Sequence, residues 1–126
     1  MVRNYLDYKL FCFNGDVKFL KIDFDRTTNH KANYYDLDMI LLPFGENECP
    51  PNHNRIFEKP KNMHIMIDLA KKISKNFPFV RVDFYNVDGD IYFGELTFYP
   101  GSGYTKFVPD SADYEWGKLF KYSFKH

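Results

Sequence analysis

The sequence has little cysteine, no excess charge of either sign and no long hydrophobic run. Its two cysteines, Cys12 and Cys49, lie in unrelated contexts without metal-ligand spacing, so neither a zinc site nor a disulfide framework is indicated. Lysine plus arginine and aspartate plus glutamate both number 17, which gives a nucleic-acid or membrane surface no bulk electrostatic support. The longest apolar run, residues 39–42, is too short to span a bilayer, and no signal peptide is visible. We therefore expect a soluble cytoplasmic protein with no nucleic-acid partner and no membrane span.

Aromatic residues, in contrast, are abundant. The chain has 126 residues, the size of one domain with a real but modest core, and 20% of them are aromatic. Most of the 14 phenylalanines and 10 tyrosines alternate with polar residues in strand-like runs. This pattern favours core packing in a sheet. Exposed rings that stack on bases or sugars are the alternative.

Residues 79–103 are the most informative stretch, and they read as a β-hairpin followed by a glycine-rich turn. Apolar and polar residues alternate in 80–86 and again in 91–98, the period of two expected of strands. Asp88-Gly89-Asp90 between them is a turn signal. If all three residues form the loop, Asp83 lies opposite Glu95, and Arg81 lies opposite Thr97 on the same face.

This pairing predicts a site with a particular chemistry. Directly opposed carboxylates repel each other unless a cation sits between them or one holds a proton. With Arg81 and Thr97 beside them, Asp83 and Glu95 suit Mg²⁺ carrying phosphate oxygens. The alternative is that Arg81 simply pairs with Asp83 or Glu95 on a solvated strand face. A two-residue loop would shift the register by one residue and separate the two carboxylates.

The sequence pattern of the N-terminal half predicts a second hairpin and a polar loop. Asn14-Gly15 between alternating apolar runs at 8–13 and 16–25 is a strong hairpin signal. Residues 26–38 lack either period and read as a loop, either solvated or facing phosphate through Arg26, His30 and Lys31. Residues 39–44 are expected to form a short buried strand, and residues 45–61 an extended connector.

The remaining elements are helices and one turn. Residues 62–76 carry an apolar stripe at helical spacing, with Asn62 as the expected N-cap; the stripe comprises Met66, Leu69, Ala70 and Ile73. The glycine-rich turn at 100–103 offers backbone N–H groups that could approach an anion. Residues 111–121 are expected to form a short C-terminal helix. Together these elements predict an α+β fold: an antiparallel sheet built on two hairpins, with one long helix and a short C-terminal helix.

Several of these motifs form a recognisable pattern. Arg81-x-Asp83, the turn at 88–89 and Glu95-x-Thr97-x-x-Pro100-Gly101 resemble the C-terminal signature of the ATP-grasp superfamily, which includes the D-alanine–D-alanine ligases. The blocks DYKLFCFNG, KIDFDRTTNHKANYYDLD, EKP and FPFVRVDFYNVDGDIYFGELTFYPGSG resemble more specifically the TupA-like ATP-grasp proteins, over about residues 7–118. Those proteins are associated with bacterial cell-surface polymers such as teichuronopeptide and exopolysaccharide, and are often labelled glycosyltransferases.

The resemblance implies Mg²⁺ and ATP as cofactors. Asp83 and Glu95 would be Mg²⁺ ligands that bridge ATP phosphates. Thr97 stands where many relatives have an asparagine ligand, and its neutral hydroxyl is a poorer fixed ligand than an amide carbonyl. Arg81 would stabilise charge on the phosphoryl group. In such enzymes a carboxylate attacks the γ-phosphate, and an amine or other nucleophile then captures the acyl-phosphate.

Three further residues receive roles only through the resemblance. The backbone amides of Gly101 and Ser102 would face the reacting acyl group. Lys31 matches the position of a phosphate-contacting lysine in ligase relatives. The implied substrates are a nucleotide and a small molecule or glycan.

The resemblance also bears on domain organisation. Residues 1–126 correspond to a single domain, the C-terminal ATP-grasp lobe, and the N-terminal nucleotide-binding region of the family has no counterpart in them. The expectation is a lobe that holds nucleotide from one side and needs a missing lobe or a partner chain. Whether it is an enzyme stays open. The alternatives are a transferase of exopolysaccharide assembly and a non-catalytic module that binds a glycan or a protein.

Overall fold

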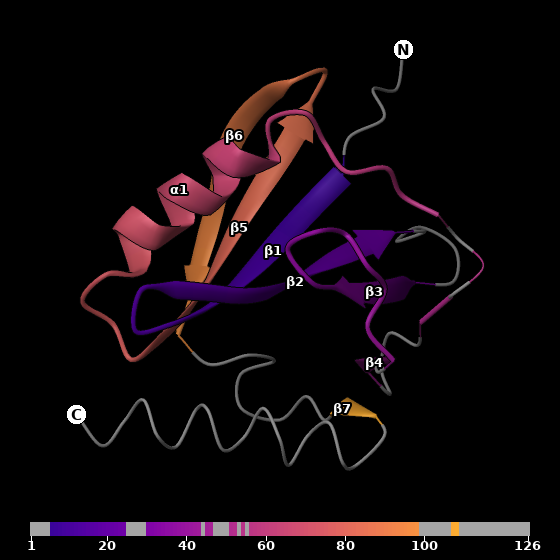
Figure 1. The fold of residues 1–126 in the computed structure, drawn as a ribbon, viewed down its shortest axis with the longest axis horizontal. Coiled ribbons are helices and arrows are strands. Elements are labelled where there is room, and N and C mark those ends of the chain that lie inside the picture. Colours follow the sequence, from indigo (N-terminus) through magenta and orange to yellow (C-terminus); the bar gives the residue numbers. More distant parts are fainter. Residues whose placement is uncertain are drawn as a thin grey trace.

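A five-stranded antiparallel sheet with one helix across a face forms the body of the protein (Figure 1). The computed structural model describes residues 6–24, 30–43, 45–46, 51–52, 54, 56–98 and 107–108. The elements are β1 (Leu6–Phe13), β2 (Asp16–Phe24), β3 (Lys31–Tyr35), β4 (Gly45–Glu46), α1 (Met63–Ser74), β5 (Phe79–Val87), β6 (Asp90–Thr97) and β7 (Phe107–Val108). The large sheet has the order β3-β2-β1-β5-β6, and β4 pairs with β7 separately. This is the expected α+β class, and β3 makes the sheet larger than two hairpins.

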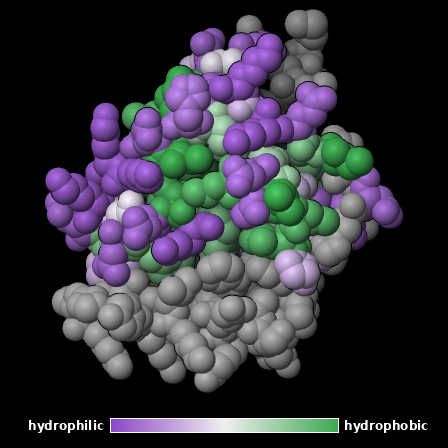
Figure 2. Space-filling model, in the orientation of Figure 1, coloured by the Kyte–Doolittle hydropathy of each residue, from purple (hydrophilic) through white to green (hydrophobic). Residues whose placement is uncertain are grey.

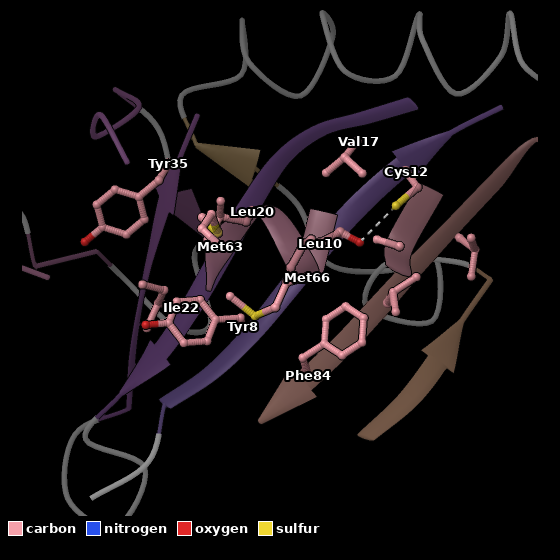
Figure 3. Packing of buried hydrophobic residues seen from close by; sticks show 13 residues of the cluster. Tyr8, Leu10, Cys12, Val17, Leu20, Ile22, Tyr35, Met63, Met66 and Phe84 are labelled. Carbon is pink, nitrogen blue, oxygen red and sulfur yellow. Dashed lines mark hydrogen bonds between the residues drawn. The ribbon is translucent and has the colours of Figure 1, made fainter. Parts of the chain in front are cut away.

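Strand alternation gives the sheet one apolar face, and α1 covers it. The buried side chains on this side come from β1, β2, β3, β5 and α1, and several are drawn in Figure 3: Tyr8, Leu10, Cys12, Leu20, Ile22, Tyr35, Phe84, Met63 and Met66. The predicted helix is confirmed, but its buried stripe is rotated: Met63 and Ser74 are buried, whereas Leu69 is 37% exposed. Hydrophilic residues gather on the side of the molecule where α1 lies (Figure 2).

Asn62 occupies the N-cap position of α1, as predicted, but its side chain does not cap the helix. Its Nδ2 donates to the carbonyl oxygen of Gly89 at 2.8 Å, and its Oδ1 accepts from Asn86 Nδ2 at 2.8 Å. The side chain therefore ties the start of α1 to the β5–β6 turn. This tertiary contact competes with the local capping bond.

Two predictions for the segment after β2 are wrong. The expected loop at 26–38 contains β3, and the described part of the expected strand at 39–44, residues 39–43, is not a strand: Met39 has φ 63° and Leu41 forms an isolated bridge with Tyr35. β3 was not predicted because its sequence is polar. Asn33 is fully buried, and two 2.8 Å hydrogen bonds with the backbone of Asn52 satisfy its amide group. The predicted turn at 100–103, the predicted helix at 111–121 and Arg26 lie outside the described residues.

The two hairpin turns differ in how well they were predicted. Asn14 and Gly15 form the first turn with φ of 53° and 84°, as expected for Asn-Gly. The second loop has two residues rather than three: Val87 pairs with Asp90, and Asp88 and Gly89 make the turn. The register next to this turn therefore differs by one residue from the predicted one.

A β-bulge in β6 restores the predicted register farther along. Phe84 pairs with Phe93 but Val82 pairs with Leu96, so that β6 has one more residue than β5 in this interval. Beyond the bulge Arg81 pairs with Thr97, as predicted. The bulge includes Gly94, where a Cβ would lie 2.9 Å from the Tyr85 ring and 3.1 Å from the carbonyl oxygen of Asp83.

Gly94→Ala is expected to destabilise the protein by about 1–3 kcal/mol, because the methyl group would press on Tyr85 and on the backbone of Asp83. The matched control is Gly89→Asn: a Cβ there meets nothing within 4 Å, and asparagine tolerates the positive φ of 89°. Urea unfolding of both variants measures the difference. Equal stability of the two variants would contradict the steric role of Gly94.

The buried thiol of Cys12 predicts a loss of stability at high pH. Burial raises the pKa of this thiol to about 11, an effect that a hydrogen bond with Ser74 partly offsets. In the unfolded chain the thiol ionises at about pH 8.5. Between these values the unfolded state releases a proton that the folded state keeps, so stability falls as pH rises. Between about pH 8.5 and 11, the free energy of unfolding of Cys12→Ala should therefore fall by roughly 1–3 kcal/mol less than that of wild type, as measured by urea unfolding.

Candidate functional site

The sheet face opposite α1 carries a layer of charged side chains. They occupy the alternate positions of the three central strands: Asp7 and Lys9 on β1, Lys21 and Asp23 on β2, and Arg81 and Asp83 on β5. All but Arg81 are buried. The aromatic cluster of Phe11, Phe13, Phe19, Tyr34 and Phe79 continues the same face along these strands. Burying several charges is costly even when they are paired, so this layer is a candidate for function.

Arg81 and Asp83 form the best-defined pair in the layer. Arg81 Nε donates to Asp83 Oδ1 at 2.9 Å, and Arg81 Nη2 donates to Asp83 Oδ2 at 3.0 Å. Burial alone lowers the pKa of Arg81, but the hydrogen bonds and the negative charge of Asp83 raise it overall. The two oxygens of Asp83 therefore fix the orientation of the guanidinium, which stays fully charged.

The same guanidinium reaches the neighbouring strand. Arg81 Nη2 donates to Thr97 Oγ1 at 3.2 Å and lies 3.8 Å from Glu95 Oε1. The Asp83 side chain is only 2% exposed, whereas that of Glu95 is 66% exposed. The four residues predicted from the hairpin thus come together, with Arg81 linking the buried carboxylate to the exposed one.

Lys9 lies at the centre of the layer. Its Nζ is 2.9 Å from Asp83 Oδ2, 3.2 Å from Asp7 Oδ2 and 3.9 Å from Asp23 Oδ2. Sequence reasoning did not select Lys9 as a site residue. The available signal was its position: Lys9 pairs with Lys21 on one side and with Asp83 on the other, on the polar face of all three strands.

His30 extends the layer at the edge of the sheet. Its Nε2 lies 2.9 Å from Asp23 Oδ1, and Lys21 Nζ lies 3.8 Å from the same oxygen. Among the three residues of the predicted phosphate-facing loop, His30 is the one that the structure places beside this layer. Lys31, the next residue, pairs with Phe24 on β2, so alternation places it on the face of α1 rather than with Asp83. Gly101 and Ser102 lie outside the described residues.

A cleft of about 1150 Å³ adjoins the charged layer where β1 begins and β2 and β5 end. Asp7 and Asp23 belong to both the layer and the cleft wall. The other wall is formed by the connector before α1, the first turn of α1 and the β5–β6 turn, including Phe57, Lys59, Lys61 and His64. The volume slightly exceeds the range typical of small-molecule sites.

The described residues fit a magnesium ion that arrives with its own ligands. No three His, Cys, Asp or Glu side chains within the described part of the chain lie together as a metal site. Mg²⁺, however, is commonly held by one or two carboxylates plus substrate phosphates. Asp83, Glu95 and Thr97 offer such hard oxygen donors, and the ammonium of Lys9 already stands as a cation at Asp83.

An antiparallel sheet with one face on a helix and buried charges on the other is consistent with an ATP-grasp-type lobe. The family model for TupA-like ATPgrasp matches residues 2–121. The chain therefore belongs to the TupA-like ATP-grasp family. No curated protein and no solved structure gives a significant match. None of the helices in the described residues is long and apolar enough to cross a membrane.

Asp83→Asn is expected to lower the free energy of unfolding by about 3–5 kcal/mol, because the buried Lys9 and the half-buried Arg81 lose the carboxylate that they share. Asp16→Asn is the matched control: this aspartate is exposed and its Oδ2 lies 4.0 Å from Lys18 Nζ, so a change below about 1 kcal/mol is expected. Urea unfolding at neutral pH tests both. A loss at Asp83 no larger than that at Asp16 would show that the charged layer contributes nothing to stability.

Proposed function

We propose that this chain forms one lobe of an ATP-dependent active site, which binds Mg²⁺–ATP and activates a carboxylate as an acyl-phosphate. The observation that carries the proposal is the Arg81 guanidinium, which Asp83 holds in place beside Thr97 and Glu95. These are the residues of the ATP-grasp signature, and family membership of the chain supports the same conclusion.

Arg81 is the residue suited to bind the phosphoryl group. A guanidinium carries five N–H donors in a rigid fork that matches phosphate oxygens. The described residues take three of these donors, from Nε and Nη2. Nη1 is left to donate to an anion, while Asp83 keeps the fork from turning. Such a preorganised cation stabilises charge that develops during phosphoryl transfer.

Asp83, Glu95 and Thr97 are the residues that would hold the metal. When bound, Mg²⁺ neutralises charge on the nucleotide phosphates and orients them. Lys9 and Arg81 both bind Asp83 and fix its carboxylate. Glu95 is exposed, so its side chain can turn toward an incoming ligand. We propose that the backbone amides of Gly101 and Ser102 face the acyl group, and that Lys31 contacts phosphate, on the resemblance alone.

The cleft beside the charged layer is the proposed place of the nucleotide. Asp7 and Asp23 belong to its wall and pair with Lys9 in the layer, and Lys59 and Lys61 bring cations to the lining itself. Phe57 and Tyr85 add aromatic surface to the lining. A second lobe would close the site from the other side. The family association further suggests a role in the biosynthesis of cell-surface polysaccharide or teichuronopeptide.

Calorimetric titration of Mg²⁺–ATP tests the proposal. Wild type is expected to bind, and Arg81→Met to bind at least tenfold more weakly, because the phosphate loses its fixed cation. Asp83→Asn/Glu95→Gln should abolish the dependence of binding on Mg²⁺. Lys18→Met removes an exposed lysine away from the layer and should bind like wild type.

Two results would contradict the proposal. Equal affinity of wild type and Arg81→Met would remove Arg81 from the site. Absence of any binding at millimolar nucleotide would rule out an ATP-binding role for this chain alone and favour the non-catalytic binding module.

A further inference from the structure

Lys9 is an ammonium group enclosed by carboxylates from three strands. Its Nζ lies 2.9 Å from Asp83 Oδ2 on β5, 3.2 Å from Asp7 Oδ2 on β1 and 3.9 Å from Asp23 Oδ2 on β2. The exposed fraction of the Lys9 side chain is 8%, and that of each aspartate is lower. Lysine is rarely buried to this extent unless it is paired.

Lys9 and Arg81 together occupy the carboxylate that a metal would need. Asp83 Oδ2 accepts from both Lys9 Nζ and Arg81 Nη2, and Asp83 Oδ1 accepts from Arg81 Nε. Three of about four acceptor positions of the carboxylate are thus in use. A divalent cation at Asp83 would displace one of these donors and would also meet the repulsion of two adjacent positive charges.

Lys9 has alternative partners within reach. Asp7, on β1 itself, and Asp23, on β2, both lie within 4 Å of its ammonium and are themselves buried. If Lys9 leaves Asp83, its charge therefore remains paired. The exchange requires a rotation of one side chain and no movement of the strands. The cation at Asp83 can consequently be replaced without opening the core.

We propose that Lys9 is a resident counter-ion that keeps Asp83 from binding a divalent cation alone, so that the metal enters only together with a polyphosphate. Lys9 is thus a positioning residue, and this role rests on the proposed nucleotide-binding function. The negative charge of the phosphates draws Lys9 away from Asp83, while Arg81 stays paired with Asp83, and one acceptor position of the carboxylate is thereby freed for the metal. Metal and nucleotide then bind as one unit.

Titration of the full chain with Mn²⁺ alone, followed by the paramagnetic resonance signal of the free ion, tests the first half of the proposal. Lys9→Met is expected to bind Mn²⁺ at least tenfold more tightly than wild type. Lys21→Met is the matched control: Lys21 is equally buried, with 8% of its side chain exposed, but its Nζ lies 3.8 Å from Asp23 Oδ1. It should bind Mn²⁺ like wild type. In the double variant Lys9→Met/Asp83→Asn the gain should disappear.

The second half is tested by repeating the titration with a non-hydrolysable ATP analogue. Wild type should gain at least tenfold in Mn²⁺ affinity, after subtraction of binding to free analogue, and Lys9→Met less than threefold. A wild type that binds the analogue without this gain would overturn the proposal. Failure of the analogue to bind would instead overturn the proposed function, while the titrations with Mn²⁺ alone would still decide whether Lys9 blocks the metal.

Removal of Lys9 leaves three buried carboxylates, so a folding control accompanies the test. Thermal melts with and without Mn²⁺ should show that the ion stabilises Lys9→Met and not wild type, and Lys9→Gln provides a milder variant. If Lys9→Met is unfolded alone, Mn²⁺ should restore its cooperative melt. An Mn²⁺ affinity of either variant within twofold of that of wild type, or a variant that stays unfolded in millimolar Mn²⁺, would overturn the proposal.

Discussion

The contact between Lys9 and Asp83 is the constraint on which the polar side of this protein depends. It joins β1 to β5 by a 2.9 Å ion pair in the middle of the sheet, where neither side chain reaches much solvent. A lone charge at this depth would be prohibitive, so the neighbouring positions on β1, β2 and β5 had to supply opposite charges. The result is a layer in which Lys9, Lys21 and Arg81 each have a carboxylate within 4 Å.

This arrangement separates the tasks of the two sheet faces. The face under α1 is filled with apolar side chains and, together with the aromatic cluster on the other face, supplies the hydrophobic contribution to stability. The opposite face keeps cations and carboxylates fixed in a buried setting, where electrostatic interactions are stronger than in water. Asp7 and Asp23 of this layer also line the cleft where β1 begins and β2 and β5 end. Membership of the TupA-like ATP-grasp family agrees with that division.

In the central hairpin the predicted loop length is wrong, but the predicted grouping of side chains around Arg81 is still found. The loop has two residues instead of three, an error that by itself would send Asp83 and Glu95 to opposite faces. The bulge in β6 adds one residue before Arg81 pairs with Thr97, so the predicted group assembles. The pattern of alternation could not reveal the bulge, because Gly94 matters through its contacts with Tyr85 and the backbone of Asp83. β3 was missed for a related reason, since buried Asn33 is satisfied by Asn52, 19 residues away.

The two hairpins, the helix and the group of residues around Arg81 could be predicted from local sequence, because turn chemistry, periodicity and short motifs are local properties. Only the tertiary structure decided the strand order, since β1 and β5 are more than sixty residues apart along the chain. That order placed Lys9 against Asp83 and put Lys31 on the other face. Pairing between distant strands depends on the packing of whole faces, and no window of the sequence contains that information. The counter-ion of the candidate metal ligand was therefore visible only in the folded chain.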